Sequence, residues 1–166
     1  SSEVSVCFEQ SYGYIDGDSA SLAELLAILS ELSQIPARQD IAVTGSINQF
    51  GEVQPVGGVT AKIHGFHRLC KMRGLTGQQG VAMPASNIGE LMLCEEVRDD
   101  IAKGQFHIYP IRGVDQAIAL LLESPPGARV ADTFRPARSV HAKVLERLKE
   151  LHGLSDSKNQ DISKDE

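Results

Sequence analysis

Hydrophobic and polar residues alternate in some stretches and recur every three or four positions in others, so the sequence divides into strands and helices. In "EVSVCFE" (3–9), Val4, Val6 and Phe8 alternate with mostly polar neighbours, the two-residue period of a half-buried strand. Between Ser19 and Gln34, leucines recur at steps of three and four, which is typical of an amphipathic helix with a wide apolar face. The pattern predicts a strand, a loop and then a helix.

The remaining pattern continues this succession of strands and helices. It predicts further strands at 40–47, 52–56, 80–84 and 106–111. It predicts further helices at 59–73, 113–123 and 140–151, and one or two short helices within 86–104. The turn "NQFG" (48–51) favours a hairpin between the second and third strands. Strands that alternate with helices in this way predict an α/β domain whose sheet carries helices.

The sequence also suggests where the domain ends. Residues 1–123 hold all the alternating elements, whereas "SPPGARVADTFRPARS" (124–139) is rich in turn residues and reads as a connector. With the helix at 140–151 it forms an appended segment, 124–152, which we expect to pack on the domain or on a neighbouring subunit. The tail, 153–166, is polar and is expected to be disordered.

Charge and composition exclude several classes of function. The formal net charge of −6 argues against binding the nucleic-acid backbone, which basic domains usually do. No run approaches the roughly 18 apolar residues that a membrane span needs. The first residues lack the pattern of a signal peptide. Three widely spaced cysteines without a CxxC motif favour reduced thiols, and therefore a cytoplasmic location.

Ser19 is a candidate nucleophile because it lies where a Gly/Asp loop meets a helix. The first turn of a helix leaves N–H groups without partners, and these favour an oxyanion. The plainer alternative is that Asp18 or Ser19 only caps the helix, or that Ser21 and Glu24 form a capping box.

A serine nucleophile needs a base, and none of the five histidines lies in a typical serine-hydrolase context. His64 and His67, three residues apart, have a spacing that two metal ligands can use, although packing or surface roles are the simpler interpretation. Lys62 is the other candidate base, because it follows the double glycine of "VGGVTAKIHG" in the first turn of a helix. The helix dipole disfavours an ammonium ion there. A solvated surface lysine is the alternative.

Four stretches together resemble the proteolytic domain of the Lon family of ATP-dependent proteases. They are "DGDSAS" (16–21), "VTGSINQFGEVQPVGGVTAKIHG" (43–65), "VAMPASN" (81–87) and "IYPIRGVDQAIALLL" (108–122). Their order and intervals agree with the family, including the 43 residues that separate Ser19 from Lys62. The resemblance covers roughly residues 3–123. It implies the α/β (α+β) fold of this domain, which resembles the ribosomal protein S5 domain 2-like fold.

The resemblance also implies roles for individual residues. Ser19 corresponds to the nucleophile of a serine–lysine dyad and Lys62 to its general base. Thr44 corresponds to a threonine that orients the lysine amine, and Asp16 to an acid near the site. Asp18 and Ser19 would contribute backbone groups to the oxyanion region.

Two departures qualify this resemblance. The commonest bacterial form has Pro before the serine and Gly two residues after it, where this chain has Asp18 and Ser21. This version is similar to the B-type and related Lon-like branch. The family domain also has further β structure before the serine, so we expect this chain to be a fragment that lacks the N-terminal β region.

The function implied is ATP-dependent endopeptidase activity on unfolded or damaged proteins, in a homo-hexameric ring. No cofactor is expected on this chain. ATP and magnesium would bind an ATPase region elsewhere, because the sequence holds no GxxxxGK[ST] loop. The alternatives are a Lon-like scaffold or interaction module without protease activity, and a small-molecule amidase that uses the same serine and lysine.

Overall fold

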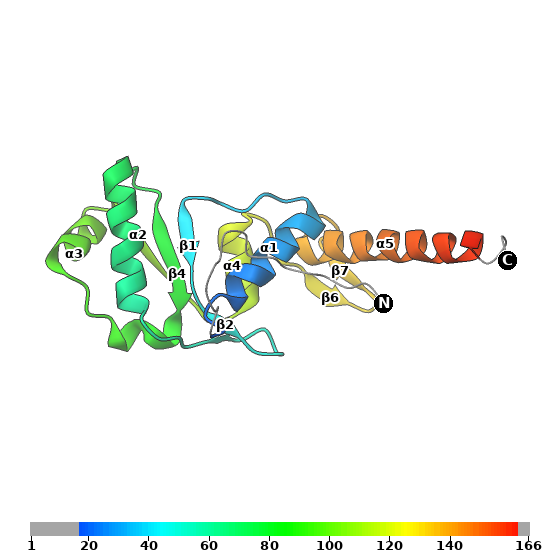
Figure 1. Cartoon of the computed structure of the whole chain (residues 1–166), viewed down its shortest axis with the longest axis horizontal. Helices are drawn as coiled ribbons and strands as arrows, with labels where there is room; N and C mark the ends of the chain where they lie inside the picture. Colours follow the sequence, from blue (N-terminus) through cyan, green and yellow to red (C-terminus); the bar gives the residue numbers. More distant parts are fainter. Residues whose placement is uncertain (1–16, 163–166) are drawn as a thin grey trace.

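A three-stranded parallel sheet lies at the centre of the protein in the computed structural model, which describes residues 17–162 (Figure 1). Its strands are β1 (Ile41–Val43), β4 (Gly80–Pro84) and β5 (His107–Ile111), in the order β1-β4-β5. The middle strand, β4, pairs Ile41 with Gly80 on one side and Gly80 with His107 on the other. All five residues of β4 are buried, as expected for a strand with neighbours on both edges and helices on both faces.

Helices cover both faces of this sheet, so the α/β fold predicted from the sequence is confirmed. The helices of the domain are α1 (Ser21–Ser33), α2 (Val59–Arg73), the 3₁₀ helix η1 (Ala85–Glu90), α3 (Glu95–Ala102) and α4 (Val114–Leu121). The bounds of α2 and β4 agree with the prediction. The strand predicted at 3–9 lies outside the described residues.

Two apolar clusters, one on each face of the sheet, form the core. Neighbouring residues of β4 point to opposite faces, as in any strand. Ala82 therefore joins the cluster formed mainly by α1 and α4, with Leu22, Leu26 and Ile118. The other cluster contains Val81, Met83, Ile63, Val97 and Phe106, from β4, α2, α3 and the residue before β5.

The strand predicted at 40–47 is interrupted in the structure. It forms β1 and then β2 (Ser46–Ile47), which turns away to pair antiparallel with β3 (Val53–Gln54). The predicted hairpin is therefore present, but its first strand is only the last part of the predicted one. The break falls at Thr44 and Gly45, next to the predicted nucleophile.

The segment after α4 differs from the predicted irregular connector. It contains a hairpin of β6 (Ala128–Val130) and β7 (Thr133–Arg135), followed by α5 (Val140–Ile162). Helix α5 packs on α1 of the same chain, and its Val140 belongs to the core cluster of α1 and α4. It continues past the predicted end at residue 151 and projects from the body of the domain (Figure 1).

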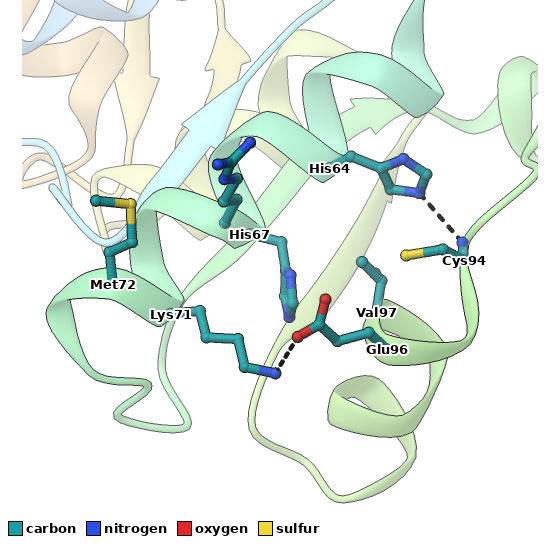
Figure 2. A pocket seen from close by; sticks show the side chains of 8 residues that line it. His64, His67, Lys71, Met72, Cys94, Glu96 and Val97 are labelled. Carbon is teal, nitrogen blue, oxygen red and sulfur yellow. Dashed lines mark hydrogen bonds and ion pairs between the residues drawn. The ribbon is translucent and has the colours of Figure 1, made fainter.

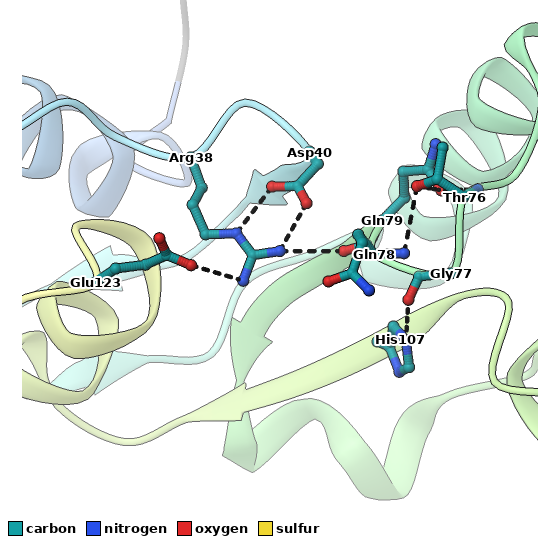
Figure 3. Close-up of polar contacts among 8 residues, drawn as sticks. All are labelled: Arg38, Asp40, Thr76, Gly77, Gln78, Gln79, His107 and Glu123. Carbon is teal, nitrogen blue, oxygen red and sulfur yellow. Dashed lines mark hydrogen bonds and ion pairs between the residues drawn. The ribbon is translucent and has the colours of Figure 1, made fainter.

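An arginine clamp holds the start of β1 to the end of α4 (Figure 3). The Arg38 guanidinium donates two hydrogen bonds to Asp40, at 2.9 and 2.6 Å, and lies 3.5 Å from the Glu123 carboxylate. It also donates to the Gln78 carbonyl, at 3.3 Å. The hydrogen bond from Arg38 holds the pKa of the Asp40 carboxyl below its usual value.

No helix within residues 17–162 is both long enough and apolar enough to cross a bilayer.

Candidate active site

Three predicted site residues come from the ends of different elements and meet at one place. Ser19 lies in the loop just before α1, Thr44 follows β1, and Lys62 lies in the first turn of α2. Thr44 is 5% exposed and its backbone N–H still donates to Ala82 of β4, so the sheet fixes its position. The fourth predicted residue, Asp16, lies outside the described residues.

Lys62 reaches this place through its side chain. Its amine donates a hydrogen bond to the Thr44 hydroxyl, with 3.0 Å between Nζ and Oγ1. Helix α2 begins after Gly58, whose φ of 70° lies in the left-handed region that glycine adopts without strain. The backbone N–H of Lys62 donates to the Gly58 carbonyl at 3.1 Å. The double glycine therefore sets the start of the helix that carries Lys62.

The loop that carries Ser19 is bound to the same segment through its main chain. The Ser19 carbonyl accepts the Gly45 N–H at 2.9 Å and the Thr44 hydroxyl at 3.3 Å. The N–H of Leu22 donates to the Gly45 carbonyl at 3.1 Å. One hydroxyl, that of Thr44, thus links the Lys62 amine to the backbone of Ser19.

The side chains on either side of Ser19 hold this loop further. The buried Ser46 hydroxyl donates to the Asp18 carboxylate, and the Ser21 hydroxyl accepts the Ile47 N–H at 3.1 Å. Neither Asp18 nor Ser21 caps α1, whose N-cap position is Ala20 without a side-chain hydrogen bond. The capping alternative considered for these residues is therefore wrong.

The contact between Ser19 and Lys62 is indirect in this structure. Within the described part of the chain, no hydrogen bond joins the Ser19 hydroxyl to the Lys62 amine, and Thr44 lies between the lysine and the Ser19 backbone. The structure therefore brings Ser19, Thr44 and Lys62 into one cluster, in which the Lys62 amine is bound to the Thr44 hydroxyl.

Gly45 makes the close approach of this loop feasible. A Cβ at this position would lie 3.1 Å from Val53, 3.3 Å from Leu22 and 3.5 Å from Pro84. Larger residues would push α1 and the β2–β3 hairpin away from β4. This crowding explains why a glycine stands next to Thr44.

Sequence reasoning gave no role to two buried polar residues near the site. Ser46 is 5% exposed and holds Asp18, whereas Asn87 is 2% exposed and binds the backbone of Val56, just before α2. Both lie inside the quoted motifs. The available signal was a polar residue in or beside an apolar strand, since a buried polar side chain needs a partner.

His64 and His67 do not act as a pair. The buried His67 lies 2.8 Å from Asp100 and packs edge-on against Phe106, whereas His64 Nε2 accepts the Cys94 N–H at 3.2 Å. The hydrogen bond from His67 lowers the pKa of Asp100, and Lys71 lowers it further. Among residues 17–162, no group of three or more His, Cys, Asp or Glu side chains is arranged to hold a metal ion.

These histidines line a pocket of about 510 Å³ between α2 and α3 (Figure 2). Arg68, Lys71, Met72, Cys94, Glu96 and Val97 complete its wall. Lys71 is paired with Glu96, and this hydrogen bond raises the pKa of the lysine. Ser19, Thr44 and Lys62 do not line this pocket, so it is separate from the cluster around Thr44.

Comparison with known proteins gives a consistent result. The model of the Lon protease (S16) C-terminal proteolytic domain matches residues 8–124. Proteins named "Putative Lon protease homolog" are 52% identical in Haemophilus influenzae and 49% identical in Escherichia coli, over 70% and 71% of this chain. An archaeal Lon protease of Thermococcus kodakarensis is 35% identical over 75% of the chain. The matched part is 20%, 20% and 18% of these three relatives, so the chain spans about a fifth of their length.

Proposed function

This chain belongs to the Lon protease family, as its C-terminal proteolytic domain, and on that premise we propose that it hydrolyses peptide bonds with Ser19 as nucleophile and Lys62 as general base. The observation that supports this most is the path from the Lys62 amine through the Thr44 hydroxyl to the Ser19 backbone. The sheet fixes Thr44 through its backbone bond to Ala82, and Thr44 in turn fixes where the Lys62 amine lies relative to the Ser19 backbone.

The reaction needs a nucleophile, a general base that also returns the proton, and a site that stabilises an oxyanion. Lys62, in its neutral form, takes the hydroxyl proton of Ser19 as Oγ attacks the peptide carbonyl carbon. The ammonium then gives that proton to the leaving amine, the C–N bond breaks, and an acyl-enzyme remains. Lys62 then takes a proton from a water that attacks the ester carbonyl carbon. The C–O bond to Ser19 breaks, and the Lys62 ammonium returns the proton to Ser19 Oγ, which releases the acid and restores the hydroxyl and the neutral amine.

The carbonyl oxygen becomes an oxyanion during both attacks. Helix α1 begins two residues after Ser19, and no side chain within residues 17–162 caps it. Backbone N–H groups at Asp18 and Ser19, together with the positive end of the helix dipole, would stabilise the charge. The contact between Asp18 and Ser46 keeps this part of the loop in place.

We extend the proposal to the whole protein that contains this chain. Its substrates are unfolded or damaged polypeptides, and it works as an ATP-dependent homo-hexamer in the cytoplasm. ATP and Mg²⁺ bind an ATPase region outside this chain, and the chain itself contributes no cofactor site. This proposal follows from family membership.

The test is peptide hydrolysis by the whole protein with ATP and Mg²⁺. We expect Ser19→Ala and Lys62→Ala each to lower kcat by about a thousandfold or more, because the groups of a catalytic unit cannot replace one another. Ser86→Ala and Lys103→Ala, at exposed positions, serve as matched controls and should retain activity.

Each result has a clear meaning. Activity that survives Ser19→Ala would rule out the proposed nucleophile. A wild-type protein that binds unfolded polypeptide but hydrolyses neither protein nor peptide would favour the scaffold alternative. Hydrolysis of small amides without hydrolysis of peptides would favour the amidase.

A further inference from the structure

The segment from Ala85 to Cys94, here called the strap, crosses the start of the helix that carries Lys62. It contains η1 and the residues that lead to α3. Three of its residues form hydrogen bonds to the beginning of α2 or to the residues before it. They are Asn87 to Val56, Met92 to Thr60, and Cys94 to His64.

Asn87 makes the strongest of these connections. Its side-chain oxygen accepts the Val56 N–H and its side-chain nitrogen donates to the Val56 carbonyl, both at 3.0 Å. The side-chain amide thus pairs with both backbone groups of Val56, as a neighbouring strand would. Its nitrogen also donates to Glu90, at 3.2 Å. At 2% exposure, Asn87 has little access to water that could replace these bonds.

The strap and the cluster of Ser19, Thr44 and Lys62 lie on different sides of α2. Thr60 and His64 are four residues apart, so they share one face of the helix. Lys62 is two residues from Thr60, which turns its side chain by about 200° from that face. The strap holds one side of the first turns of α2, and Lys62 extends from the other side to Thr44.

We infer that Asn87 is a positioning residue for the proposed reaction: by fixing Val56 it sets where α2 begins, and so where the Lys62 amine meets Thr44. Only Gly57 and Gly58 separate Val56 from the first residue of the helix. Two glycines give a flexible connection that does not hold its own geometry. The fixed point before the helix is therefore Val56, which Asn87 holds. This inference rests on the proposed function.

The test compares Asn87→Ala and Asn87→Asp with two controls in the whole protein with ATP and Mg²⁺. Asn87→Ala removes both bonds to Val56, and Asn87→Asp replaces the donor with a carboxylate oxygen that faces a carbonyl. Glu90→Gln keeps an acceptor for the Asn87 nitrogen. Phe106→Leu loosens the apolar cluster beneath α2 and α3, to which Val56 also belongs, and leaves both hydrogen bonds between Asn87 and Val56 in place.

We expect both Asn87 variants to lower kcat by about tenfold or more, because a small displacement of a catalytic group is costly. KM should change by less than about twofold, and Glu90→Gln should keep its kcat within about twofold, as surface substitutions usually do. Hydrogen exchange at the Lys62 and Ile63 amides should become faster in the Asn87 variants only. A kcat of wild-type size in Asn87→Ala would overturn the inference.

Two further outcomes separate this inference from its premise. If Phe106→Leu lowers the melting temperature as much as Asn87→Ala and loses as much kcat, Asn87 acts through general stability and the inference is wrong. If exchange at Lys62 becomes faster in Asn87→Ala while Ser19→Ala stays active in the same assay, the dyad fails although Asn87 does fix the start of α2.

Discussion

The loop around Ser19 and the side chain of Lys62 meet the same threonine, but through different kinds of contact. The loop is held by main-chain bonds to Gly45 and by the side chains of Ser21 and Asp18, which bind Ile47 and Ser46. Among the residues that the structure describes, the Lys62 amine has one hydrogen-bond partner, the Thr44 hydroxyl, at the end of a flexible side chain. Loss of one contact should therefore matter little for the loop and much for the lysine.

Thr44→Val breaks the single contact and should have the largest effect. Valine keeps the branched shape of threonine but gives the Lys62 amine no acceptor, while the Gly45 N–H still holds the Ser19 carbonyl. We expect kcat to fall by about tenfold to a hundredfold, as for a misplaced general base. The free energy of unfolding should fall by only about 1 kcal/mol. Peptide hydrolysis and thermal unfolding, measured on the same preparation, give both values.

Thr76→Val is a matched control, because Thr76 is exposed in a loop and its hydroxyl binds Gln79. If Thr44→Val and Thr76→Val had the same kcat, the proposed role of Thr44 would be wrong.

Ser46→Ala tests the loop around Ser19, which several contacts hold. It removes one of several contacts that hold the nucleophile loop, and water can reach the exposed Asp18 carboxylate in its place. We expect the free energy of unfolding to fall by about 0.5–1 kcal/mol, and kcat to fall by about fivefold at most. Steady-state kinetics measure the kcat of Ser46→Ala and of Thr44→Val in the same assay. A loss as large as that of Thr44→Val would show that the loop depends on a single contact as well.

Asp100→Asn should have the smallest effect, a loss of stability that is present at neutral pH and disappears at low pH. His67 holds the pKa of Asp100 below the unfolded value of about 3.9, so the stabilisation is fully present above that pH. It is lost as the pH falls through the lower folded value. The difference in unfolding free energy between wild type and variant should be constant from neutral pH down to about pH 4, and should shrink below it.

Urea unfolding at a series of pH values measures this difference. The kcat at neutral pH should stay unchanged, because Asp100 contacts His67 and Lys71 on the side of α2 away from Thr44. A difference that grows as the pH falls would contradict the assigned cause of the pKa shift.

Local signals made some elements predictable from sequence. Helix α2 and strand β4 have the predicted bounds, because Gly57 and Gly58 precede the helix and Pro84 closes the strand. Long-range contacts decided the elements that were predicted wrongly. The strand at 40–47 breaks at Thr44 and Gly45, and Gly45 lies close to Leu22 and Pro84, which are 23 and 39 residues away in sequence.

The C-terminal hairpin escaped prediction for a different reason. Every residue of β6 is exposed and β7 is only partly covered, so no apolar alternation marks these strands. Turn residues dominate the segment instead. Helix α5 was predicted to be shorter because its last residues are polar, whereas the structure continues it to Ile162.

The candidate site divides in the same way. Ser19, Thr44 and Lys62 were identified through the resemblance of their motifs, and the contact of Thr44 with the Lys62 amine is present. The partners of Ser21 and Asp18 could not be predicted, because they lie 26 and 28 residues away on β2. Spacing alone predicted a capping box at Ser21, whose hydroxyl the N–H of Ile47 occupies instead.

The docking of α5 gives the domain a mechanical connection. One end of this helix is buried against α1 through Val140, and the other end projects from the body (Figure 1). We therefore expect a force applied near Ile162 to act through α5 on α1, the helix that begins two residues after Ser19. A linker or a tethered bead at that end would pull on the nucleophile loop from outside the active site.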